Sequence, residues 1–87
     1  MAGVRLRTEA LHWREVEEQV VAIHIASREY LTVNRTGTVL WPALLAGTTT
    51  DSLQRLLVER FEVDEETAAR DVDALIDDLR SRDLLAP

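Results

Sequence analysis

The sequence predicts an α+β domain in which a three-stranded antiparallel sheet is followed by three helices, an order that also resembles a winged helix-turn-helix. Two observations predict it. Apolar side chains between residues 11 and 33 recur at alternate positions, the period of a half-buried strand. From residue 34 onward they recur at the three- and four-residue spacing of amphipathic helices. A run of strands before a run of helices is typical of the α+β class.

Three strands are expected before residue 34, forming a meander with one apolar face to cover. In the clearest of them, the β-branched Val21, Ile23 and Ile25 fall on alternate positions. A polar turn, Ser27-Arg28-Glu29, separates this strand from the one that returns. The expected strands are residues 11–16, 20–25 and 30–33.

Three helices are expected after the sheet, with polar side chains at their starts. Asn34, residues 48–51 and Asp64 are suitable caps, because short polar side chains accept hydrogen bonds from free N–H groups of a first turn. Gly47 should end the first helix, which Pro42 is expected to kink or to divide into two short pieces. The apolar stripes are Val39, Leu40, Trp41, Leu44 and Leu45; Leu53, Leu56, Leu57 and Phe61; and Ala68, Val72, Leu75, Ile76 and Leu79.

The chain has the size of a single domain, which is expected to occupy residues 1–87. Its 46% hydrophobic and 30% charged residues are typical of a folded globular chain. The absence of cysteine excludes disulfides, thiol nucleophiles and thiolate metal sites. The sequence contains no long apolar run and no signal-peptide core, so no membrane association and a cytoplasmic location are expected.

Residues suited to catalysis or metal binding are few. The only histidines, His12 and His24, lie in two predicted strands without a third ligand, and are interpreted as surface or packing residues. The serines lack an adjacent base, and the three glycines do not form a phosphate-binding loop. The sequence therefore predicts a protein that is not an enzyme and holds no cofactor or metal.

The charge distribution argues against nucleic acid as a partner. The net charge is −6, and residues 64–82 contain seven acidic side chains against three arginines. These residues would form the recognition helix of a winged helix-turn-helix, where phosphate contacts require the opposite balance. A winged-helix DNA-binding regulator remains the alternative from another functional class, whereas a neutral or basic peptide would not be repelled.

A set of short motifs runs through residues 13–85. The residues are Tyr30, Val33, Asn34, Thr36, Gly37, Leu40, Trp41, Leu44 and Leu45, then Thr50, Leu53, Leu57, Phe61, Asp71, Val72, Leu75 and Leu79, and finally Leu84 and Leu85. Their order and spacing resemble the PqqD-like family, the small domains called RiPP recognition elements, which bind leader segments of ribosomally made peptides. Asp83 stands where the family often has a glycine that ends the third helix, and aspartate tolerates the left-handed conformation needed there.

The resemblance implies that an extended leader adds as an extra antiparallel strand beside the third strand, in a groove walled by the third helix. One flank of that helix is preferred because Ala74 is small, and the acidic residues there could pair with a basic or hydroxyl-bearing leader residue. Whether Leu31 and Val33 or Tyr30 and Thr32 face the groove stays open, and Tyr30 could equally be a core aromatic. Trp41, Leu53, Leu57, Val72, Leu75 and Leu79 are assigned to the core, where Leu84 and Leu85 should fold back. The implied leader-binding residues are Arg28, Glu29, Tyr30, Leu31, Thr32, Val33, Thr67, Asp71, Ala74 and Asp78.

The resemblance also implies partners. The chain would act in trans, presenting a precursor peptide to the leader peptidase and the cyclase of a lasso-peptide pathway. The alternative within the family is a peptide chaperone for a radical SAM enzyme that makes a quinone cofactor. Without a leader, the protein would be a monomer or a dimer paired through its edge strand.

Overall fold

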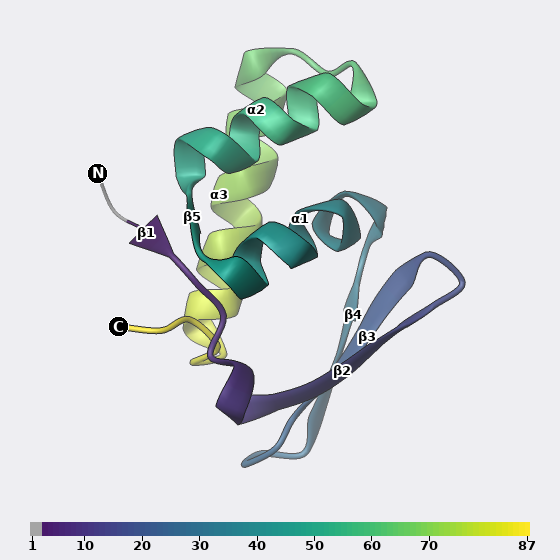
Figure 1. The fold of residues 1–87 in the computed structure, drawn as a ribbon, viewed down its shortest axis with the longest axis vertical. Helices are drawn as coiled ribbons and strands as arrows, with labels where there is room; N and C mark the ends of the chain where they lie inside the picture. The colour runs from purple at the N-terminus through teal and green to yellow at the C-terminus, as the bar shows by residue number, and fades with distance from the viewer. Residues whose placement is uncertain (1–2) are drawn as a thin grey trace.

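The computed structural model describes residues 3–87 and shows the predicted order of strands and helices (Figure 1). The strands pair antiparallel in the order β2-β3-β4, which confirms the α+β class and the three-stranded sheet. Each strand lies within one residue of its predicted bounds. The elements are β2 (Leu11–Val16), β3 (Gln19–His24), β4 (Glu29–Val33), α1 (Arg35–Ala46), α2 (Thr50–Phe61) and α3 (Glu65–Ser81).

Three short elements were not predicted: β1 (Gly3–Val4), the 3₁₀ helix η1 (Thr8–Ala10) and β5 (Thr48–Thr49). β1 pairs antiparallel with β5, so the N-terminal arm lies against the start of α2. The turn before β4 comprises residues 25–28, and Glu29, predicted to lie in the turn, already pairs with His24.

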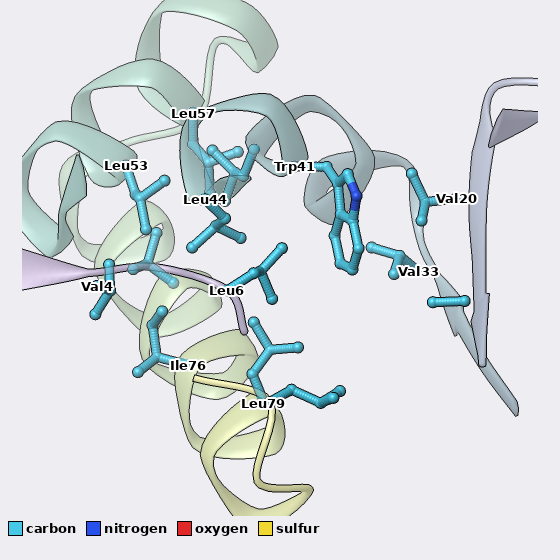
Figure 2. Close-up of a cluster of buried hydrophobic side chains, with 14 of the residues drawn as sticks. Val4, Leu6, Val20, Val33, Trp41, Leu44, Leu53, Leu57, Ile76 and Leu79 are labelled. Atoms are coloured by element: carbon cyan, nitrogen blue, oxygen red, sulfur yellow. The ribbon is translucent and has the colours of Figure 1, made fainter. Parts of the chain in front are cut away.

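The core lies between the helices and one face of the sheet, with Trp41 near the centre (Figure 2). Its indole ring lies beside Val20 and Val33 of the sheet, and the ring of Trp13 meets it edge-on at a centroid distance of 5.9 Å. Leu84 is buried in the same cluster, which confirms that the C-terminal leucines fold back onto the core.

Pro42 lies inside one uninterrupted helix, so of the two expected outcomes the division into two short pieces was wrong, and a kink at Pro42 stays a prediction. A proline inside a helix removes a single backbone hydrogen bond and crowds the preceding turn. The buried Leu40, Trp41 and Leu44 hold the helix against the core on both sides of that position. Tertiary packing therefore outweighs the local cost.

Residues 34–38 anchor α1 to the sheet. Asn34 Oδ1 accepts hydrogen bonds from the Gly37 N–H at 2.9 Å and from Thr36 Oγ1 at 3.0 Å. A Cβ atom on Gly37 would clash with Val33 Cγ1, so the close approach of the first turn to β4 requires glycine. The next residue, Thr38, is buried and bonds to both β3 and β4.

α3 is capped at both ends. The Thr67 N–H donates to Asp64 Oδ1 at 2.7 Å, and this bond lowers the pKa of the Asp64 carboxyl. At the other end Asp83 adopts a left-handed conformation with φ of 59°, as the sequence predicted. Arg7 Nη1 donates to the Asp83 carboxylate at 2.7 Å, a bond that raises the pKa of Arg7. The N-terminal arm thus ties down the C-terminal end of α3.

Candidate functional site

A groove of about 470 Å³ lies between the free edge of the sheet and α3. One wall is the end of β4, from Leu31 to Val33, and the other is formed by Asp71, Ala74 and Asp78 of α3. Figure 1 shows that the two walls run in opposite directions: β4 leads toward α1, whereas α3 leads away from α2 toward the C-terminus. The groove therefore lies where a further strand could be added to the sheet.

The floor of the groove is apolar. Leu40 and Leu57 are almost completely buried, and Leu75 is half-buried beside Gly37. The assignment of Leu57 and Leu75 to the core is confirmed, since Leu57 belongs to the buried cluster and Leu75 packs against it, and both also line the groove. Of the three leucines, the half-buried Leu75 is the one most accessible to a ligand.

The structure brings six of the ten predicted leader-binding residues together in this groove: Leu31, Thr32, Val33, Asp71, Ala74 and Asp78. Four others do not line it. Arg28 lies in the turn with φ of 62°, Glu29 begins the strand, and Tyr30 lies on the other face. Thr67 lies in the first turn of α3, next to its cap.

Besides Leu57 and Leu75, four groove residues were not among the predicted leader-binding residues: Asn34, Thr36, Gly37 and Leu40. Asn34 was interpreted as a helix cap, and all four were part of the motif that resembles the PqqD-like family, but none was assigned to leader binding. Gly37 carried a usable signal, because a glycine in the first turn of a helix indicates that something approaches its backbone closely.

The structure decides which face of β4 lines the groove. Val33 is buried and Leu31 half-buried, both on the face that packs against the helices. Tyr30, on the opposite face, is 74% exposed, so the alternative that it is a core aromatic was wrong. Alternate side chains of a strand point to opposite faces, and one residue at the core fixes the rest.

The direction of the backbone groups in β3 follows from two hydrogen bonds. The Val20 N–H donates to Thr38 Oγ1 at 3.0 Å, and the same hydroxyl donates to the Val33 carbonyl at 3.3 Å. The backbone groups of Val20 and Val33 therefore face each other across Thr38. On the other side of β3, the Ile25 N–H donates to the Ala10 carbonyl next to β2.

Backbone groups alternate in direction along an antiparallel strand. Because Val33 directs its groups toward β3, Leu31, two positions earlier in the same strand, does so as well, and Tyr30 and Thr32 direct theirs away from β3. β4 is an edge strand, so these N–H and C=O groups lie on the open side of the sheet, next to the groove. Such an edge is a template for pairing with another chain.

Two carboxylates at the α3 wall differ in their surroundings. Asp78 Oδ1 accepts a hydrogen bond from Arg82 Nε at 3.2 Å. Asp71 is exposed and forms no ion pair with any side chain among residues 3–87. One end of the groove therefore carries a neutralised pair and the other an uncompensated negative charge.

Comparison with known proteins agrees with this geometry. The family described as "Coenzyme PQQ synthesis protein D (PqqD)" matches residues 19–85, which include the whole groove. The chain belongs to the PqqD family. No curated protein matches this PqqD-family chain. No helix within its described part is long and apolar enough to cross a bilayer.

Two solved structures share the fold of this PqqD-family chain. The first is "Lasso peptide synthetase B1 complexed with the leader peptide", with 27% sequence identity and a TM-score of 0.83, over 99% of this chain and 100% of that one. The second is "TbiB1 in Complex with the TbiA(beta) Leader Peptide", with 21% identity and a TM-score of 0.83, over 93% of each chain. At 21% identity, the second likeness indicates a common fold.

Proposed function

We propose that this protein binds the leader segment of a ribosomally made precursor peptide as a fourth strand on the edge of β4. The observation that carries the proposal is an unpaired edge strand that forms one wall of a groove. The similar lasso peptide synthetase B1, at 27% identity, is a complex with a leader peptide. The open edge supports strand addition as the mode of binding, and the match supports a leader peptide as the ligand.

In this mode the backbone supplies affinity and the side chains supply specificity. Tyr30 and Thr32 offer their N–H and C=O groups to the incoming strand. Leader residues opposite Leu31 and Val33 direct their side chains into the groove, because directly paired residues share a face of the sheet. The apolar floor of Leu40, Leu57 and Leu75 favours aliphatic or aromatic side chains at those positions.

We further propose that the bound leader is presented to separate enzymes, and that the protein has no chemistry of its own. A leader peptidase and a cyclase of a lasso-peptide pathway in the cytoplasm are the proposed partners, and the lasso peptide synthetase B1 match supports that pathway. Two other functions are less well supported: a peptide chaperone for a radical SAM enzyme, and a DNA-binding regulator. If α3 read DNA, Asp71 and Asp78 would face the negatively charged phosphates and repel them.

Ala74→Trp is expected to weaken leader binding about ten-fold, because an indole at the α3 wall fills space that leader side chains need. Ala74 is exposed, so the thermal unfolding midpoint should not change. Calorimetric titration with the leader encoded beside this protein's gene measures the effect. Asp73→Trp, on an exposed position of the same helix that does not line the groove, is the matched control.

The same titration distinguishes the alternatives. If Ala74→Trp bound the leader as tightly as the natural protein, the leader would not occupy this groove. Binding of a short DNA duplex in place of the leader would instead favour the DNA-binding alternative.

A further inference from the structure

We propose that Asp71 selects leaders that carry a lysine or arginine on the N-terminal side of the apolar residues that fill the groove. This selection rests on the proposed function, since it concerns a leader added as a strand to β4. The end of the groove at Asp71 would favour a cationic leader residue, and the end at Asp78 and Arg82 would disfavour one. Three features of the groove lead to it.

The first feature is the unequal charge of the two ends. Asp78 is half-buried and already bonded to Arg82, so a cationic leader residue there would compete with an existing ion pair and be repelled by Arg82. Asp71 is exposed, lines the groove and has no ion-pair partner in the described part of the chain. A cation is therefore favoured near Asp71 and disfavoured near Arg82.

The second feature is direction. β4 and α3 run in opposite directions on the two sides of the groove (Figure 1). A leader strand antiparallel to β4 consequently runs in the same direction as α3. It passes Asp71 before Asp78, so the residue beside Asp71 precedes those beside Ala74 and Asp78 in the leader sequence.

The third feature is spacing. Asp71 and Asp78 are seven positions apart on α3, which corresponds to roughly 10 Å along the helix axis. An extended strand spans that length in about three residues. Between the two carboxylates lies Ala74, whose small side chain leaves room above the apolar floor. Ala74 follows Asp71 by three positions, or roughly 4.5 Å along the axis, so the favoured leader has a basic residue about one or two positions before its main apolar anchor.

Charge selection of this kind acts mainly on specificity. Ion pairs that remain accessible to water contribute modestly, and salt screens them. A correctly placed lysine is therefore expected to bind about three- to ten-fold more tightly than the same lysine beyond the apolar anchor, with the difference shrinking at high salt.

A lysine scan of the leader encoded beside this protein's gene tests the proposal. Lysine is placed at each position in turn outside the apolar anchors, and affinities are measured for the natural protein, Asp71→Asn and Asp73→Asn. Asp73→Asn removes the same charge from an exposed position of α3 outside the groove, so it controls for net charge.

The natural protein and Asp73→Asn should show the same preference for lysine before the anchor, and Asp71→Asn should lose it. A flat profile in the natural protein, or an unchanged profile in Asp71→Asn, would overturn the role of Asp71 while leaving strand addition intact. Failure of the unsubstituted leader to bind would be a different result, because it would overturn the proposed function and the selection together.

Discussion

Thr32→Pro is expected to weaken leader binding roughly 30- to 150-fold, or about 2–3 kcal/mol, while the protein stays folded. The Thr32 N–H points to the open side of β4, so its loss removes no hydrogen bond within the sheet. Proline is tolerated in an edge strand at such a position. An added strand, however, would lose a donor and meet the proline ring at the centre of the pairing.

Two further variants separate the backbone from the side chain. Thr32→Val keeps the N–H and the β-branched shape, so its leader affinity should stay within about two-fold of the natural protein. Leu31→Pro removes an N–H that points into the sheet, and it should unfold the protein instead. Calorimetric titration and circular dichroism measure the two properties. Full leader affinity in Thr32→Pro would show that the leader does not pair with this edge.

Thr38→Val is expected to lower the free energy of unfolding by roughly 2–4 kcal/mol. The hydroxyl of Thr38 accepts from the Val20 N–H and donates to the Val33 carbonyl in a buried position. Valine keeps the shape and leaves both backbone groups without that partner, and a buried polar group without a hydrogen bond is costly. The loss would be a large fraction of the stability of so small a domain.

Thr38→Ser is the matched control, because it keeps the hydroxyl and removes one buried methyl group at a cost of about 1 kcal/mol. Urea unfolding followed by circular dichroism compares the variants. If Thr38→Val were as stable as Thr38→Ser, the hydroxyl bridge between β3 and β4 would not contribute to stability. Contacts other than Thr38 would then have to fix the direction of the backbone N–H and C=O groups in β4.

The sequence was most informative where a local pattern has one physical meaning. Alternating β-branched residues located the sheet to within one residue, and Asn34 and Asp64 marked helix starts because their side chains cap free N–H groups. The left-handed conformation of Asp83 was expected from the family resemblance instead, because Asp83 stands where the family often has a glycine.

What the sequence could not supply depends on distant contacts. β1 and β5 are two residues each and form only because the N-terminal arm meets the start of α2. The face of Tyr30 depends on which side of the sheet the helices cover, and strand periodicity alone does not determine this. The continuity of α1 through Pro42 likewise depends on burial of its neighbours.

The central claim, that a leader pairs with the open edge of β4, is tested most directly by amide hydrogen exchange followed by NMR. In the free protein the Tyr30 and Thr32 amides should exchange faster than that of Leu31, which lies inside the sheet. Addition of saturating leader should slow Tyr30 and Thr32 about ten-fold or more, together with smaller changes along α3. Leader binding that leaves both amides in fast exchange would contradict strand addition at this edge.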